Sequence, residues 1–235
     1  MIIAIHQPDY IPYLGYFYKL AKSDKFVYLD DAQYSNDNMH NWNKIKTPQG
    51  ELRLKVPVEH HLGDALNTVR TRDELKWKEK HLKTIEMNYG KAPYFQEIFP
   101  RFKELLLQDY PNISEMNIAI NTWIAESFGL KTQFFKSSEM DILTVREERV
   151  IDLCVALEGD VYISGHGASV YQEEEHFTSR GVKLVYTDYE PIEYEQLWKK
   201  AGFLANMSVL DYVFNCGFDW ASVEEKVQNI LNAKE

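Results

Sequence analysis

The amino-terminal run of residues 2–15 places the tightest limits on how this chain can fold. Ile2–Ile5 is a short apolar run typical of a buried β-strand, and His6 and Gln7 follow it directly. Pro8 and Pro12 fix φ and lack an N–H donor, so the segment between them cannot be helical throughout, whereas Pro12 suits the first turn of a helix. We therefore expect His6 and Gln7 at the carboxyl end of a strand, facing the amino end of a helix.

The segments after the first strand continue an alternation of helices and strands that is typical of an α/β sheet. A helix over about 13–23 and a strand at Phe26–Leu29 follow, and this connection predicts parallel strands with a right-handed crossover. A second series of strand, loop, helix and strand runs over 161–186, and Gln133–Phe135 is a further candidate strand. Because ligands of open parallel sheets bind at the carboxyl ends of strands, we expect the loops after both first strands to line one pocket.

The segments in between have different periodicities. Residues 43–57 are typical of a β-hairpin with its turn at Thr47–Gly50, and three helices are expected within 73–129. Gly90 is expected at the C′ position that ends the first helix, and Asn112 is expected to cap the third. The sequence therefore predicts an α/β fold with parallel Rossmann-like sheet units, a helical middle segment at about 73–129 and a β-hairpin, in a single domain over 1–235.

Composition narrows the classes of function. The formal net charge of −10 argues against a general nucleic-acid binder, although one nucleotide in a local basic pocket stays compatible with it. Two cysteines are too few for a disulfide framework, Cys154 lies in an apolar helical stripe, and no apolar run approaches a membrane span of ~20 residues. We expect a cytoplasmic protein without an export signal, and homo-oligomer formation is left open.

Four residues of the first unit are the leading candidates for chemistry. His6 can move a proton near neutral pH, Gln7 can orient a substrate, and Tyr10 offers a ring and a hydroxyl, which makes these three the catalytic candidates. Lys19 could face an anionic group of the substrate. Each of these alone is also compatible with a purely structural role.

The second strand ends in two carboxylates. Successive strand residues point to opposite faces, so only one of Asp30 and Asp31 is expected to face the crevice, which favours a substrate contact of Asp30 over a paired acid and base. Capping or turn formation is the alternative. The histidines show no metal-ligand spacing, so no metal site is predicted and no cofactor is identified.

The loop Ser164–Ser169 carries Gly165 and Gly167 between a strand and a helix. It lacks the third glycine of a dinucleotide fingerprint and the end of a P-loop, but its backbone N–H groups could approach a phosphate or carboxylate. The alternative is a turn that glycine fits for steric reasons. Ser164, Gly165 and Gly167 are substrate-binding candidates.

The hairpin is cationic in an otherwise acidic chain. Strand alternation predicts that Lys44 and Lys46 share one face, which would give a small surface suited to a diphosphate. A solvated hairpin face is the alternative interpretation. Lys46 is thus another substrate-binding candidate.

Spaced motifs run along nearly the whole chain: His6-Gln7-Pro8-x-Tyr10-x-Pro12-Tyr13-Leu14-Gly15, Leu29-Asp30-Asp31-x-Gln33, Asn41-x-Asn43-x-Ile45-Lys46, Tyr162-Ile163-Ser164-Gly165-x-Gly167-Ala168-x-x-Tyr171, Tyr194-x-Gln196 and Ser208-x-x-Asp211-x-x-x-Asn215-x-Gly217. With these motifs the chain resembles the WbqC-like family of bacterial surface-polysaccharide loci. Gln33, Asn43 and Tyr171 stand within the motifs and complete the substrate-binding candidates. Trp42 is a departure, because relatives tend to carry an arginine beside the asparagine, and a phosphate contact of that arginine is not carried over.

The resemblance implies an accessory enzyme of O-antigen or capsule synthesis that acts on a nucleotide-activated sugar. The most specific expectation is acyl or aminoacyl transfer to an amino sugar, with a nucleotide sugar and an acyl donor as ligands and His6 as the base. One alternative is a non-catalytic sugar-nucleotide-binding module of a glycan assembly complex. A nucleotidyl-transfer enzyme is a weaker alternative, because the chain has no His-x-x-His or His-x-Gly-His motif.

Overall fold

A computed structural model describes residues 1–234, with Tyr171 described by its backbone alone. Within that range a five-stranded sheet has the order β7-β2-β1-β8-β9, and every neighbouring pair is parallel. The α/β fold with parallel sheet units is therefore confirmed. The strands are β1 (Ile2–His6), β2 (Lys25–Tyr28), β7 (Gln133–Lys136), β8 (Val161–Ser164) and β9 (Lys183–Tyr186).

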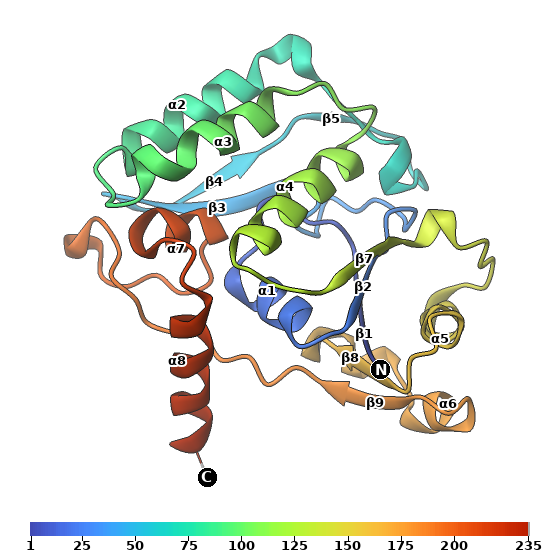
Figure 1. The fold of residues 1–235 in the computed structure, drawn as a ribbon. Coiled ribbons are helices and arrows are strands. Elements are labelled where there is room, and N and C mark those ends of the chain that lie inside the picture. Colours follow the sequence, from blue (N-terminus) through green and yellow to red (C-terminus); the bar gives the residue numbers. More distant parts are fainter. Residues whose placement is uncertain (235) are drawn as a thin grey trace.

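The two faces of the sheet bury different helices, as the alternation of β1 requires. Ala4 packs with α1 (Leu14–Ala21) and α4 (Ile113–Ser127), whereas Ile3 and Ile5 pack with α5 (Arg146–Ala156) and α6 (Glu174–Ser179). Figure 1 shows the sheet between these two layers. Both faces of β1 are covered, which explains why its sequence is continuously apolar.

The predicted helical middle is present and packs on the α1 face of the sheet together with the hairpin (Figure 1). Asn112 accepts a hydrogen bond from the Glu115 N–H at 2.9 Å, so the predicted cap of α4 is confirmed. The remaining elements are β3 (Trp42–Thr47), β4 (Gly50–Lys55), β5 (Val58–Glu59), β6 (Arg70–Thr71), α2 (Trp77–Tyr89), α3 (Phe95–Leu107), α7 (Val209–Cys216), α8 (Trp220–Asn232) and the short 3-10 helices η1 (Leu66–Thr68), η2 (Asp73–Leu75), η3 (Ser137–Glu139), η4 (His166–Tyr171) and η5 (Lys199–Ala201).

Helix α2 ends at Tyr89 and is followed by Gly90, so the expected end of this helix is confirmed. The φ of Gly90 is −56°, which is right-handed. A Cβ added there would lie 2.7 Å from the Glu86 carbonyl oxygen, so glycine is required by close packing of the backbone instead.

The strand order reverses between β1 and β8. From β1 the chain adds β2 and β7 on one side of the sheet, then returns to add β8 and β9 on the other. In open parallel sheets the crevice at such a topological switch point is the usual place for a ligand. The pairing of Ala4 with Ile163 brings His6 and Gly165 to the same end of the two central strands, as the sequence predicted.

Candidate functional site

His6 is the last residue of β1 and stands at this switch point. Its Nδ1 lies 3.0 Å from the Gln7 carbonyl oxygen, and since that oxygen can only accept, the contact assigns the ring proton to Nδ1. Nε2 then carries the lone pair. The side chain keeps 34% exposure, and its ring packs edge-on against Tyr16 with centroids 4.9 Å apart. His6 is thus oriented by its surroundings and stays partly exposed.

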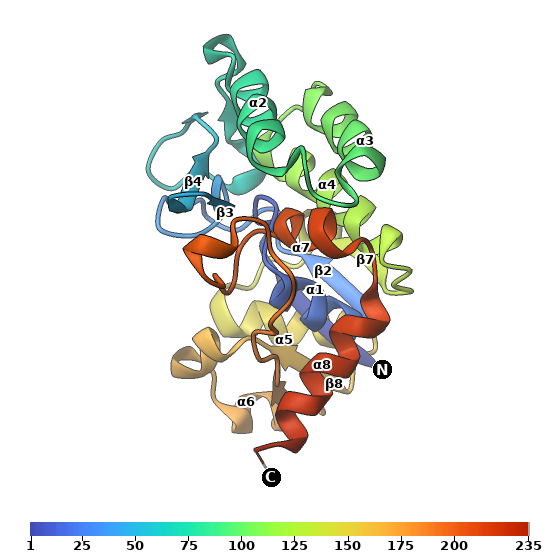
Figure 2. The ribbon, with the colours of Figure 1, turned by 90° about the vertical axis from the view of Figure 1, so that its left-hand side faces the viewer.

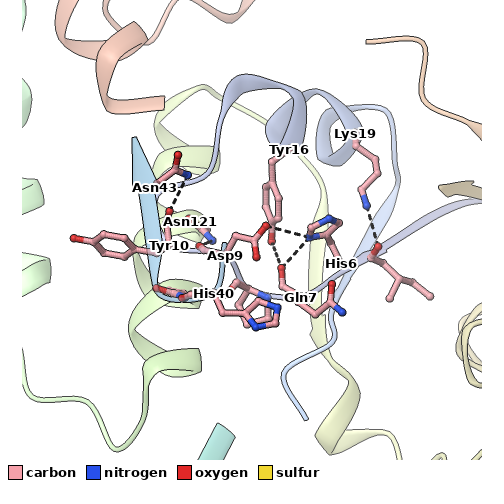
Figure 3. Close-up of polar contacts among 12 residues, drawn as sticks. His6, Gln7, Asp9, Tyr10, Tyr16, Lys19, His40, Asn43 and Asn121 are labelled. Carbon is pink, nitrogen blue, oxygen red and sulfur yellow. Dashed lines mark hydrogen bonds and ion pairs between the residues drawn. The ribbon is translucent and has the colours of Figure 1, made fainter. Parts of the chain in front are cut away.

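Asp9 and Lys19 surround His6 with charge (Figure 3). Asp9 Oδ2 lies 3.8 Å from His6 Nδ1, and burial raises the pKa of Asp9 to about 7. Lys19 Nζ donates to the Ile5 carbonyl oxygen at 2.9 Å, and burial lowers the pKa of Lys19 to about 7. Burial and then the Lys19 charge lower the pKa of His6 to about 3, so the ring is neutral at pH 7.

Tyr10 does not belong to this site, and its predicted catalytic role is corrected. The side chain is fully buried, and its hydroxyl lies 3.0 Å from His81 Nδ1 on α2. Figure 3 shows the ring pointing away from His6. Tyr10 is therefore a core residue that joins the opening loop to the helical layer.

Gln7 remains beside His6. Its carbonyl oxygen also accepts from the Tyr16 hydroxyl at 3.2 Å, so the backbone of Gln7 holds both aromatic neighbours. The side-chain amide of Gln7 is partly exposed at the same edge of the sheet and stays a candidate for contacting a ligand.

Lys19, Asp30 and Gln33 lie in other environments than the sequence suggested. Lys19 is 4% exposed, so it acts on the electrostatics of the site from behind β1 and offers no surface to a ligand. Asp30 is buried and accepts from Ser138 N at 3.0 Å, Ser138 Oγ at 2.6 Å and Ser137 Oγ at 3.1 Å. These contacts favour the structural alternative, in which Asp30 holds η3 against β2. Gln33 is exposed on the loop that pairs with Ala65.

Asn43 is also a structural residue here. Its Nδ2 donates to the carbonyl oxygens of Tyr10 at 3.1 Å and Ile11 at 3.0 Å, and its Oδ1 accepts from Lys44 N at 2.8 Å. Ile11 has φ of 39°, a conformation that a β-branched residue rarely adopts. Asn43 thus holds a strained turn closed, and the predicted substrate contact is not supported by this placement.

The predicted cationic face of the hairpin does not form. Lys46 is 1% exposed and points inward, while Lys44 pairs with Glu51 at 2.8 Å. The centre of the Trp42 ring lies 3.4 Å from the Arg53 guanidinium carbon in a cation–π contact. No diphosphate surface of the expected kind is present on the described residues of this hairpin.

The glycine loop, Ser164–Ser169, does not support the alternative in which its glycines are needed for a tight turn. Gly165 has φ of −80°, and a Cβ added at Gly165 or Gly167 would meet no atom within 4 Å. Neither glycine is therefore required by the turn itself. Ser164 is buried, and because its register partner is Ile5, its side chain faces the α5 side of the sheet, opposite to His6. The side chain of Tyr171 lies outside the described residues.

Sequence reasoning missed a set of buried amides beneath the opening loop. Asn117 Nδ2 donates to the carbonyl oxygens of Pro8 and His40, both at 2.8 Å, and Asn121 Nδ2 donates to the Asp9 carbonyl oxygen at 2.9 Å. Both asparagines project from α4, four positions apart. Their spacing on one stripe of an otherwise apolar helix was the available signal.

The parallel sheet, its covered faces and the reversal of strand order beside His6 define a doubly wound α/β protein. The model of the WbqC-like protein family matches residues 7–223, and the chain belongs to this family. An uncharacterized protein of Mycobacterium tuberculosis, Rv1507c, is 32% identical over 219 residues, which cover 92% of this chain and 94% of the relative. No solved structure matches the chain.

Residues 1–234 were searched for membrane-spanning helices and for clusters of metal-binding side chains. None of their helices has both the length and the apolar character to cross a bilayer. Within the same range, no group of three or more His, Cys, Asp or Glu side chains is arranged to hold a metal ion.

Proposed function

We propose that the protein is an enzyme of bacterial surface-glycan biosynthesis that transfers an acyl or aminoacyl group to the amine of a nucleotide-linked amino sugar. The observation that carries the proposal is the place of His6 at the β1–β8 switch point, where the Gln7 carbonyl oxygen holds Nδ1 and leaves the lone pair on Nε2. The glycan setting rests on what the family resemblance implies.

In this proposal His6 is the general base. As the neutral sugar amine forms its N–C bond to the activated acyl carbonyl, Nε2 takes the proton that the nitrogen loses. The resulting imidazolium is stabilised by the Asp9 carboxylate, 3.8 Å from Nδ1. When the tetrahedral intermediate expels the leaving group with its electron pair, the imidazolium returns the proton to that group.

The loop after β8 has the role of holding the donor. Its glycines leave the Cβ positions empty, so a ligand can approach the backbone of Gly165 and Gly167 closely. Backbone N–H groups in such a loop suit a phosphate or a developing oxyanion. In this proposal, His6 after β1 is the fixed base and the glycine loop after β8 is the open binding loop.

The test begins with a thermal-shift screen of nucleotide sugars, acyl-CoAs and folates, in which a ligand at 100 times its Kd adds about 2.7 kcal/mol to the unfolding free energy. For the sugar so identified, His6→Gln is expected to keep the affinity within a few-fold and to lower the rate of mass change by roughly 10²–10⁴. His61→Gln, an exposed histidine on another loop, is the control that keeps the full rate.

The same experiment separates an enzyme from a non-catalytic sugar-nucleotide-binding module. A wild-type protein that binds its sugar tightly and leaves its mass unchanged with every acyl donor would establish the module instead. Loss of affinity in step with activity in His6→Gln would remove His6 from the role of base. Release of diphosphate from a sugar phosphate and a nucleotide would favour nucleotidyl transfer.

A further inference from the structure

Helix α4 carries a polar stripe inside the protein. Figure 2 shows α4 between α3 and the strands β2 and β7 of the sheet. Ser114, Asn117 and Asn121 lie three and four residues apart, so they share one face of this helix. All three residues are fully buried. Each polar atom of the stripe must therefore find its hydrogen-bond partner inside the protein.

Only the nitrogen atoms of this stripe have such partners. Asn117 Nδ2 and Asn121 Nδ2 donate to carbonyl oxygens of the opening loop, residues 7–12. Because a carbonyl oxygen can only accept, these bonds fix which end of each amide is the nitrogen. Both Oδ1 atoms and the Ser114 hydroxyl form no hydrogen bond with any described atom of residues 1–234. The stripe therefore keeps two unused acceptors and one unused hydroxyl.

His40 adds an unused donor beside this stripe. Asn117 Nδ2 donates to the His40 carbonyl oxygen at 2.8 Å, so the backbone of His40 lies against α4. The Ser35 N–H donates to His40 Nδ1 at 3.3 Å, which places the ring proton on Nε2. Burial lowers the pKa of His40 to about 4, so the ring is neutral at pH 7. In the part of the chain that the structure describes, this buried Nε2–H has no acceptor.

The mixture of unused groups selects what can bind them. A cation would suit the amide oxygens but would be opposed by the N–H of His40, and an anion would be opposed by the amide oxygens. A buried ion would also lose its hydration without an opposite charge to compensate it. Water both donates and accepts, carries no charge, and is the usual partner of buried polar groups that no protein atom satisfies.

We propose that internal water molecules bind the polar stripe of α4 and the ring of His40. They accept from His40 Nε2 and donate to Oδ1 of Asn117 and Asn121, and the Ser114 hydroxyl bonds to water in the same way. Since the two asparagines also hold the opening loop, these waters belong to the framework that fixes the loop after His6. The inference does not depend on the reaction proposed for His6.

The first test detects the waters by NMR in the wild-type protein at pH 7. The His40 Nε2–H and the side-chain N–H groups of Asn117 and Asn121 are expected to show an NOE to water with the sign of long-lived bound water. Rotating-frame measurements separate this NOE from proton exchange. The side-chain N–H groups of Asn38, which is exposed, are the control and should show only the sign of transient hydration.

The second test uses the direction of a stability change in Ser114→Ala. If water bonds to the Ser114 hydroxyl, the substitution removes a hydrogen bond and lowers the midpoint of urea denaturation. If nothing bonds to it, the substitution removes an unsatisfied buried polar group and raises the midpoint. Ser208→Ala is the matched control, because Ser208 is equally buried and its hydroxyl accepts from Leu210 N at 3.3 Å, so its midpoint must fall.

We expect the midpoint of Ser114→Ala to fall in the same direction as that of Ser208→Ala. The proposal is overturned if the midpoint of Ser114→Ala rises while that of the control falls. It is equally overturned if the N–H groups of His40, Asn117 and Asn121 in the wild-type protein show no NOE to long-lived water, a measurement that needs no variant to fold.

Discussion

The loops after β1 and β8 leave neighbouring parallel strands at the same edge of the sheet, but their environments are opposite. The opening loop, residues 7–12, is almost entirely buried, and its carbonyl oxygens are bound by Tyr16, Asn43, Asn117 and Asn121. The glycine loop, residues 165–170, is held mainly by its own bonds, such as Ala168 N to Gly165 O at 3.0 Å. Most of its residues are exposed.

The contrast agrees with the function proposed above. The base proposed at His6 must stay within reach of one proton, which a loop fixed by side chains from several elements provides. The donor-binding loop proposed after β8 must let a ligand reach its backbone, and side-chain contacts there would obstruct it. Substitutions should therefore damage stability in the first loop and spare it in the second.

The largest effect is expected for Asn43→Ala. It leaves the carbonyl oxygens of Tyr10 and Ile11 buried without a donor, and each such group costs about 1–3 kcal/mol, so the unfolding free energy should fall by about 2–5 kcal/mol. Urea denaturation measures the change. Asn38→Ala, an exposed asparagine of the preceding loop, is the matched control with an effect under about 0.5 kcal/mol. Equal effects of the two substitutions would contradict the clamping role of Asn43.

Acidification is expected to lower the unfolding free energy through the buried histidines around the opening loop. Burial lowers the pKa of His40 and His81 to about 4 and that of His6 to about 3, so between pH 6.5 and 4 the unfolded chain binds protons that the folded chain does not. Asp9, with its pKa raised to about 7, acts in the opposite sense with one proton. The unfolding free energy should therefore decrease as the pH falls through this window.

A pair of variants isolates one of these histidines. His81→Phe should reduce the slope of the unfolding free energy against pH by about 1.4 kcal/mol per pH unit. Both substitutions remove the hydrogen bond between the Tyr10 hydroxyl and His81 Nδ1, but Tyr10→Phe keeps the imidazole. Tyr10→Phe should therefore lower the unfolding free energy by about 0.5–1.5 kcal/mol at each pH without changing the slope. A wild-type slope in His81→Phe would contradict the contribution of His81 to the pH dependence of stability.

The last comparison, which includes the smallest effect, sets a packed glycine of α1 against a glycine of the loop after β8. A Cβ at Gly15 would lie 2.3 Å from the Tyr13 ring and 2.7 Å from the Tyr189 ring, so Gly15→Ala should cost about 1–3 kcal/mol. Gly167→Ala meets nothing within 4 Å and should change the unfolding free energy by about 0.5 kcal/mol or less. Thermal denaturation of both variants makes the comparison, and the reverse order of stability would refute the difference in packing at these two glycines.

The sequence predicted the elements of the fold better than the residues of the site. The strand at β1, the Asn112 cap and the parallel connection depend on local spacing, which a sequence displays directly. Tyr10 and Lys46 carry chemically useful groups, but tertiary packing turns the first toward His81 and the second toward Gln196. Strand periodicity gives the face of a side chain and cannot reveal which distant element covers that face.

The position of β1 in the middle of the sheet has a consequence for how the chain folds. One partner, β2, is synthesised soon after β1, while the other, β8, follows only after the whole helical middle segment. Until β8 arrives, one edge of β1 exposes unpaired backbone groups next to an apolar strand, the arrangement that invites aggregation. Closing so long a loop is a slow step, and it is also the step that brings the loops after β1 and β8 together. The ligand binding proposed for these two loops should therefore appear in the last phase of refolding.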